Sequence, residues 1–194
     1  MDFILLKEYL TQNLSQERLN HLYSTAKETQ FLLERYLPEC PSNEGYLAGL
    51  WHDAAREWVP SELLSYSLNK GIVAEEIELK NPHLLHGAVA AHLLKEMGSV
   101  EERVLRAIRW HTLGSVEMGA LGAALYVADY IEPNRKFINP SDRLALLESA
   151  TLEGLCLKVV GIHQAYFERR GRPMAPTTIE LAHYLEEGGS LLYA

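Results

Sequence analysis

Apolar residues recur at helical spacing along almost the whole chain, and no run shows the alternation expected of a strand. After a short N-terminal helix, Ser15 is placed to cap a long helix, which the prolines at positions 38 and 41 end. The apolar stripe of this helix consists of Leu19, Leu22, Tyr23, Ala26, Leu33 and Leu37. Ser42 or Asn43 then opens a helix that carries the segment WHDAAR at residues 51–56.

Turn and cap residues divide the rest of the chain into further helices with short connections. Helices are predicted over 60–71, over 82–98 after Pro82, over 99–111 with Ser99 as its cap, and over about 117–131, closed by Pro133. Asn139 and Pro140 open a penultimate helical region, and a last helix follows Pro176. There are no repeats and no low-complexity linkers. We therefore predict an all-α fold, a single compact helical bundle spanning residues 1–194.

The composition narrows the function classes. The chain has 194 residues, 47% of them hydrophobic, which suits one domain with one core. Its formal net charge of -8 opposes binding to nucleic acid or anionic membranes, and no stretch is long enough to span a bilayer. The two cysteines fit neither a zinc knuckle nor a disulfide scaffold, and the N-terminus lacks the features of a signal peptide. We expect a soluble cytoplasmic protein with no nucleic-acid or membrane partner.

The predicted helix that carries WHDAAR has a polar face of uncommon composition. At about 100° per residue, its polar face holds Gly49, His52, Asp53 and Arg56, opposite an apolar stripe. A solvated face would more often carry lysine and glutamate, and glycine allows a close approach. Two interpretations are open at this point: a ligand-bearing face, or an ordinary amphipathic helix with a surface histidine.

Further imidazoles and carboxylates recur on other predicted helices. Asp129 lies on the apolar side of its helix, one turn after Leu125, where a lone carboxylate is costly unless it is paired or binds a metal. His111 continues an apolar stripe, which is equally typical of a core histidine. His21 lies off the stripe of its helix with Arg18 on a similar face, and alone this pattern is more typical of exposed residues.

The helix over 82–98 adds three histidines, His83, His86 and His92, and the residues alone do not choose among them. Together the helices give the order His, His-Asp, His, His, Asp. Imidazole and carboxylate suit divalent ions such as Fe, Mn, Co, Ni or Zn, and two ions that share a carboxylate clamp both sides of a phosphoryl displacement. The order therefore favours a metal-dependent hydrolase with one or two ions.

This order resembles a known family. Arg18 to His21, the His52-Asp53 pair and Asp129 resemble the signature of the HD-domain phosphohydrolase superfamily. The segments LLHGAVAAHLL and AIRWHTLGSVEMGALGAALYVADYIEPNR resemble the YqeK family, whose members are symmetrical bis(5′-nucleosyl)-tetraphosphatases. The resemblance implies a single HD domain with its core at about 18–135 and C-terminal helices within 140–194 packed on it. It also implies symmetrical hydrolysis of diadenosine tetraphosphate to two ADP by a metal-activated water.

The resemblance assigns the metal ligands. Positions that hold the first metal, usually iron in this family, match His21, His52, Asp53 and Asp129. Positions that complete a second metal site or face the phosphates match His86 and His111, which selects His86 over its two neighbours. Manganese, cobalt, nickel and zinc remain alternatives to iron.

The resemblance also assigns the substrate contacts. Positions near the nucleotide phosphates match Arg18, Arg56, Thr112 and Arg135. The residues expected to take part in catalysis are His52, Asp53, Arg56, His86 and His111. The implied ligand is a small nucleotide, with ADP or GDP as product-like molecules, and both a monomer and a homodimer are open. The family often has lysine at the position of Arg56. Arginine keeps the charge and can bind phosphate bidentately, so we expect phosphate binding to be retained with an altered geometry.

Other interpretations share parts of this pattern. A 5′-nucleotidase or a phosphodiesterase for a signalling nucleotide has the same His-Asp core, and a non-catalytic regulator that binds metal and nucleotide would keep some of the ligands. The segment at 169–178, RRGRPMAPTT, either passes close to the nucleoside or forms a basic surface loop.

Overall fold

A computed structural model describes residues 3–193, and over that range it contains eleven α-helices, two 3₁₀ segments and no strand. The α-helices are α1 (Phe3–Asn13), α2 (Gln16–Tyr36), α3 (Ser42–Trp51), α4 (Pro60–Lys70), α5 (Glu76–Lys80), α6 (His86–Met97), α7 (Glu102–Trp110), α8 (Gly119–Ile131), α9 (Pro140–Leu147), α10 (Leu152–Arg169) and α11 (Pro176–Glu186). The 3₁₀ segments are η1 (Pro82–Leu85) and η2 (Val116–Met118). The all-α prediction is confirmed.

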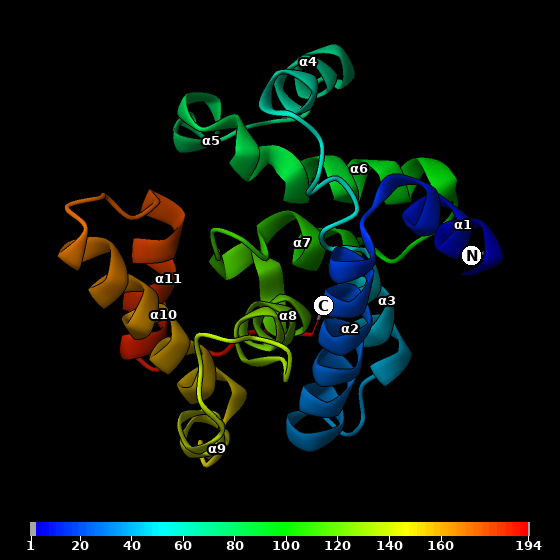
Figure 1. The fold of residues 1–194 in the computed structure, drawn as a ribbon. Coiled ribbons are helices and arrows are strands. Elements are labelled where there is room, and N and C mark those ends of the chain that lie inside the picture. Colours follow the sequence, from blue (N-terminus) through cyan, green and yellow to red (C-terminus); the bar gives the residue numbers. More distant parts are fainter. Residues whose placement is uncertain (1–2, 194) are drawn as a thin grey trace.

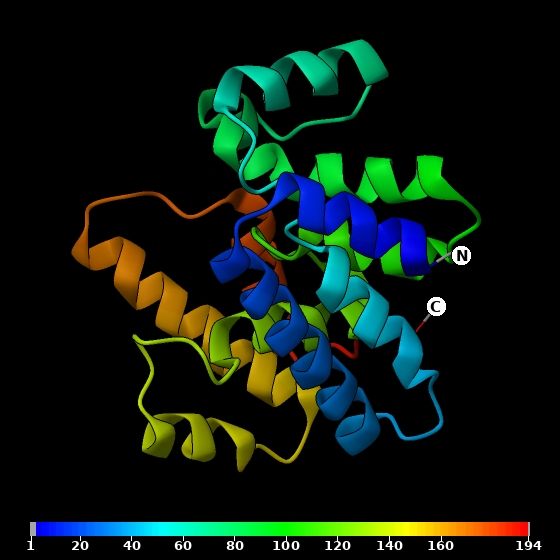
Figure 2. The ribbon, with the colours of Figure 1, turned by 45° about the vertical axis from the view of Figure 1, so that its right-hand side comes forward.

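Helix α8 lies at the centre of the bundle and is almost entirely buried. Figure 1 shows α2 and α3 on one side of it, α10 and α11 on the other, and α7 and α6 above it. In Figure 2, α4 and α5 stand above α6, outside the main bundle. A small apolar cluster of Ala55, Leu63, Leu85 and Val89 connects α4 with η1 and α6. None of the helices within residues 3–193 is both long enough and apolar enough to cross a membrane.

Several predicted boundaries are confirmed. Ser15 caps α2, where its hydroxyl accepts a hydrogen bond from the Arg18 N–H at 3.3 Å. Gly71 ends α4 in the left-handed region, at φ 63°. Asn139 caps α9 through the N–H of Asp142. The prediction that Ser99 caps the next helix is wrong, because α7 begins at Glu102. The short helix α5 was not predicted.

The prediction that a helix carries the whole WHDAAR segment is also wrong. Helix α3 ends at Trp51, and the chain continues through tight turns in which Ala54, Arg56 and Trp58 each bond to the residue three positions earlier. The second half of the helix has no solvated face, since every residue from Leu47 to Trp51 is buried. His52 and Asp53 are therefore presented by the turns after a buried helix, while Arg56 is exposed.

Gly49 does allow a close approach, as its position suggested, but what approaches is protein backbone. A Cβ at Gly49 would lie 2.5 Å from the Cα atom of Ala26 on α2. The absence of that Cβ lets α2 and α3 pack with their backbones in contact. This contact fixes the spacing between His21 on α2 and His52 at the end of α3.

Candidate metal centre

Four histidines from four parts of the chain meet in the interior. His21 lies on α2, His52 follows α3, His86 begins α6 and His111 follows α7, and all four are buried. Their rings form a continuous series, with centroid separations of 5.2 Å for His21–His52, 4.8 Å for His52–His111 and 5.0 Å for His86–His111. The structure thus brings together the histidines that the sequence order singled out.

Three of these rings are oriented by the same kind of contact with a backbone carbonyl. The Nδ1 atom lies close to the carbonyl oxygen three residues earlier: 2.8 Å for His52 with Gly49, 2.6 Å for His86 with His83 and 2.7 Å for His111 with Ile108. A carbonyl oxygen only accepts, so each Nδ1 carries the hydrogen and each neutral ring keeps its lone pair on Nε2. These carbonyl groups lie near the ends of helices, where carbonyls lack helical partners. They orient the three rings so that their Nε2 lone pairs point toward the centre of the site.

Asp53 stands between two pairs of histidines. Its Oδ1 lies 3.1 Å from His86 Nε2 and 3.5 Å from His111 Nε2. Its Oδ2 lies 3.7 Å from His52 Nε2 and 3.8 Å from His21 Nε2. Two groups of potential metal ligands result, His21-His52-Asp53 and Asp53-His86-His111, and within each group the ligand atoms lie within 4.8 Å of one another. One carboxylate belongs to both groups.

Asp129 faces the first of these groups. Its Oδ1 lies 3.0 Å from His21 Nε2 and 3.6 Å from His52 Nε2. It projects from the last turn of α8 and is about one-quarter exposed, with its carboxylate accepting a hydrogen bond from Arg135. Asp129 adds a second carboxylate to the His21-His52-Asp53 group.

The arrangement of nitrogen atoms fits bound cations. His52 Nε2 is buried and has no hydrogen-bond partner among residues 3–193. His86 Nε2 and His111 Nε2 lie 3.1 Å apart, although both Nδ1 hydrogens already face carbonyl groups, so two lone pairs point at each other. Burial lowers the pKa of His86, so protonation near neutral pH does not relieve this contact. A divalent cation at each group would satisfy these nitrogens.

The carboxylates keep their negative charge. Burial by itself would raise the pKa of Asp53, but the neighbouring His52, His111 and His86 outweigh it and hold the pKa well below its usual range. The pKa of Asp129 is lowered in the same way against its burial, by the neighbouring His21 and His52 and by Arg135. Two carboxylate anions beside four imidazoles form a donor set suited to divalent transition metals.

Glu132 is a member of the centre that the sequence did not indicate. Its Oε1 lies 3.1 Å from His21 Nδ1, and its Oε2 accepts a hydrogen bond from the Asn134 N–H at 2.7 Å. The side chain is almost fully buried, with 1% exposure. It performs for His21 the orienting role that carbonyls perform for the other histidines, and its charge makes that imidazole more basic. Burial lowers the pKa of His21, but hydrogen bonds to Asp129 and Glu132 outweigh burial and raise it.

Arginines surround the carboxylates. Arg18 donates to Asp53 Oδ2 at 2.6 Å, and Arg135 donates to the carboxylate and to the carbonyl of Asp129. Arg56 is exposed at the rim. Thr112 Oγ lies 3.1 Å and 3.0 Å from the Nε2 atoms of the paired histidines. All four residues predicted to lie near phosphates therefore line one pocket with Asp53 and Asp129, a pocket of about 240 Å³.

Four aromatic or imidazole side chains complete this pocket and were missed from the sequence: Tyr126, Tyr130, Phe137 and His163. His163 comes from α10, beyond the 18–135 core, and its Nδ1 lies 2.6 Å from the Tyr126 hydroxyl. No pattern in the sequence singled out Tyr126 or Tyr130 as pocket residues, and nothing in the sequence linked His163 to them.

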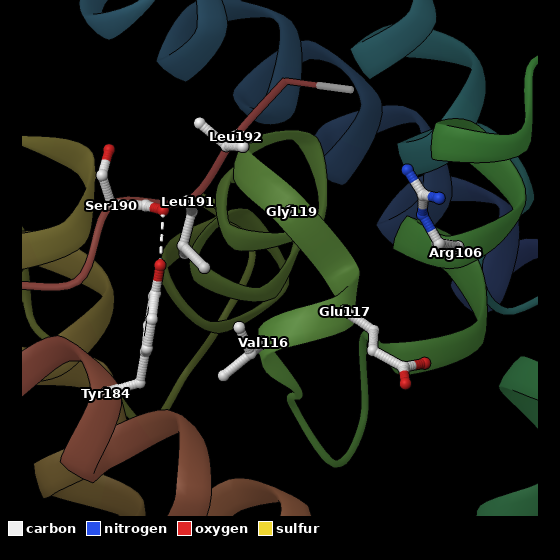
Figure 3. Close-up of a pocket in the computed structure, with 8 residues that line it drawn as sticks. All are labelled: Arg106, Val116, Glu117, Gly119, Tyr184, Ser190, Leu191 and Leu192. Atoms are coloured by element: carbon white, nitrogen blue, oxygen red, sulfur yellow. Dashed lines mark hydrogen bonds between the residues drawn. The ribbon is translucent and has the colours of Figure 1, made fainter.

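Other candidates lie away from the centre. His83 is exposed, and His92 contacts Tyr66 on α4. The basic residues at 169–172 are exposed at the end of α10 and do not line the pocket. A larger pocket of about 390 Å³ lies where the C-terminal tail passes the start of α8 (Figure 3). There the Tyr184 hydroxyl donates to the Ser190 carbonyl, and no member of the two ligand groups is present among its lining residues.

Comparisons with known proteins show what this chain is similar to. The family model for the HD domain matches residues 18–134. A symmetrical bis(5′-nucleosyl)-tetraphosphatase of Bacillus subtilis (strain 168) is 29% identical over 178 residues, which cover 91% of this chain and 94% of that protein. A protein of the same name from Halalkalibacterium halodurans is 27% identical and covers 90% of both chains. The crystal structure of a predicted HD superfamily hydrolase involved in NAD metabolism, from Clostridium acetobutylicum, superposes with a TM-score of 0.87 at 27% identity, covering 97% of this chain and 98% of that one.

Proposed function

The chain belongs to the HD-domain family, and from that premise we propose that it hydrolyses dinucleoside tetraphosphates symmetrically, converting diadenosine tetraphosphate into two ADP. The observation that carries the proposal is the position of Asp53 between two imidazole pairs, at the bottom of a pocket lined by arginines. The relatives named for this activity match along about nine-tenths of the chain.

We assign two metal positions in this centre. His21, His52, Asp53 and Asp129 would hold one divalent ion, and Asp53, His86 and His111 would hold a second. Bound ions would supply a water of lowered pKa and neutralise charge on the phosphate oxygens. Iron is the metal that we expect, from the resemblance to the YqeK family.

The side chains of this pocket would position the substrate. Arg18 and Arg135 carry the charge needed to bind the outer phosphates, and each is already directed to the centre by a carboxylate. Arg56 at the rim offers a planar pair of donors for phosphate oxygens. Thr112 offers a hydroxyl hydrogen beside the His86–His111 pair.

The reaction cleaves the central P–O–P link. A water oxygen forms a bond to one central phosphorus while the bond from that phosphorus to the bridging oxygen breaks. The bridging oxygen leaves with the electron pair as part of one ADP. The attacking water becomes a phosphate oxygen of the other ADP and gives up its protons to solvent. Since ADP ionises easily, this step needs no strong general acid, and the pocket residues act mainly by positioning and by stabilising charge.

The product identifies the reaction. Protein loaded with Fe, Mn or Co should convert diadenosine tetraphosphate to ADP as the sole nucleotide, separated by anion-exchange chromatography. Equal amounts of ATP and AMP would refute symmetrical cleavage. A panel that includes nucleoside monophosphates distinguishes this activity from that of a 5′-nucleotidase.

The ligand assignment has its own test. Asp53→Ala removes the carboxylate that both groups share, so we expect loss of bound metal and of more than about 99% of the activity. Asp142→Ala, on the exposed start of α9, is the control and should retain both. Full metal content in the Asp53→Ala protein would contradict the assignment. The oligomeric state and a cytoplasmic location remain predictions.

A further inference from the structure

One side of the pocket is an aromatic wall, formed by Tyr126, Tyr130, Phe137 and His163. Phe137 contacts Tyr130 at a centroid distance of 5.2 Å, with the rings inclined by 42°. Tyr130 meets His163 edge to face at 5.1 Å, and His163 meets Tyr126 in the same way at 5.4 Å. The wall is therefore one continuous set of rings, which lines the same pocket as Asp53 and Asp129.

The back of the aromatic wall is formed by Tyr126 and His163. Tyr126 is 3% exposed on the central helix, and its hydroxyl lies within hydrogen-bond distance of His163 Nδ1. Packing of α10 against α8 explains why these two rings are together. This packing does not explain why an apolar residue stands exposed at the front of the wall, where Phe137 is 62% exposed.

The loop before Phe137 is anchored to the metal centre. The Asn134 N–H donates to the Glu132 carboxylate and the Arg135 N–H donates to the Glu132 carbonyl at 3.0 Å. Arg135 Nε donates to the Asp129 carbonyl at 2.7 Å. Two residues later the chain presents the exposed Phe137 ring, 5.5 Å from the guanidinium carbon of Arg135. An apolar ring thus stands in water at the mouth of a pocket whose other residues are mostly charged or polar.

We propose that the aromatic wall is the nucleoside subsite and that Phe137 stacks on a base of the substrate. The inference rests on the proposed function, since a dinucleoside tetraphosphate joins flat bases to phosphates through a single ribose. With phosphates held by Arg18 and Arg135, the nearest base lies within reach of a ring two residues after Arg135. Stacking accepts any base and favours the larger surface of a purine, so the subsite selects purine over pyrimidine nucleotides.

The test separates binding of the base from binding of the phosphates. Affinities of metal-loaded protein for ADP and for inorganic pyrophosphate are measured by isothermal titration calorimetry. Phe137→Ala should weaken ADP binding about tenfold, within the range for base–aromatic stacking, and leave pyrophosphate binding unchanged. Phe137→Trp should retain ADP affinity, and UDP should bind the wild-type protein more weakly than ADP.

A matched control is available on α2, where Phe31 is 42% exposed and outside the pocket. Phe31→Ala should alter neither affinity. Equal ADP affinities of wild type and Phe137→Ala would overturn the inference, as would an equal loss for ADP and pyrophosphate. If ADP discrimination is found but diadenosine tetraphosphate is not cleaved, the subsite stands and the proposed function fails. If ADP is the product and Phe137→Ala binds it normally, the subsite alone fails.

Discussion

Replacing Glu132 by glutamine exchanges one carboxylate oxygen for an amide group and changes little else, because the two side chains have nearly the same shape. In the native protein each Glu132 oxygen has its own neighbour, the His21 Nδ1 atom at 3.1 Å and the Asn134 N–H at 2.7 Å. Glutamine has one oxygen, and its amide nitrogen donates rather than accepts. One of the two N–H groups must then face another donor.

The size of the effect follows from that conflict. The side chain is buried, so water does not replace the lost acceptor, and an unsatisfied buried donor costs about 1–3 kcal/mol of folding stability. The loss of negative charge also makes His21 a poorer ligand. Substitutions of carboxylates that orient a metal-binding histidine lower metal affinity by about 10- to 100-fold. We expect both effects in the Glu132→Gln protein.

The assay is titration of Mn²⁺ or Co²⁺ into chelator-treated protein, with chemical denaturation of the same samples. Glu78→Gln is the matched control, because Glu78 is fully buried and receives two hydrogen bonds of 2.6 Å from Arg109, away from the metal centre. The control should lose stability but keep its metal affinity. Wild-type metal affinity in the Glu132→Gln protein would refute the role that we give to this carboxylate.

Three further predictions test the packing around the centre. Gly49→Ala places a Cβ against the backbone of Ala26, which cannot move aside, so we expect the free energy of unfolding in urea to fall by about 3 kcal/mol or more. A fall of less than about 1 kcal/mol would contradict the close contact of α2 with α3. Gly87→Ala places a Cβ 3.0 Å from the Ile108 carbonyl and 3.1 Å from the His111 ring, so metal titration should show weaker binding, and unchanged affinity would count against this geometry. Burial raises the pKa of Cys156 to about 12, so at pH 8 a thiol reagent should modify only Cys40 in the native protein and both cysteines in denaturant. Two fast-reacting thiols in the native protein would show that α10 is not packed as described.

The sequence predicted the helical class and many helix ends, because caps and glycine turns act locally. Ser15, Gly71 and Asn139 each work through contacts within a few residues. The error at Ser99 has a different origin, because Glu101 occupies the cap position of α7 without a side-chain cap hydrogen bond. Cap preference favours Ser99 over Glu101 and therefore predicts the wrong start.

The order of residues along the chain indicated which side chains are candidate metal ligands, but it did not predict where those side chains lie in the structure. Helical spacing placed His52 and Asp53 on a polar helix face, whereas the structure has them buried in turns after α3. His21 lies off an apolar stripe and looked exposed, yet it is buried because Glu132 and Asp129 cover it. Periodicity along one helix does not report what a segment more than a hundred residues away will place over its polar side.

The contact between His21 and Glu132 joins residues 111 positions apart, and Asp129 reaches the His21-His52-Asp53 group from the last turn of α8. A ribosome must release residue 129 before the first group has both of its carboxylates, and residue 111 before the second group is complete. Until then the nascent chain lacks the Asp129 and Glu132 carboxylates, and it offers only an incomplete set of ligands to the metal pool of the cell. Selective metal acquisition is postponed until the helices have assembled, so loading of the correct ion takes place on a folded protein.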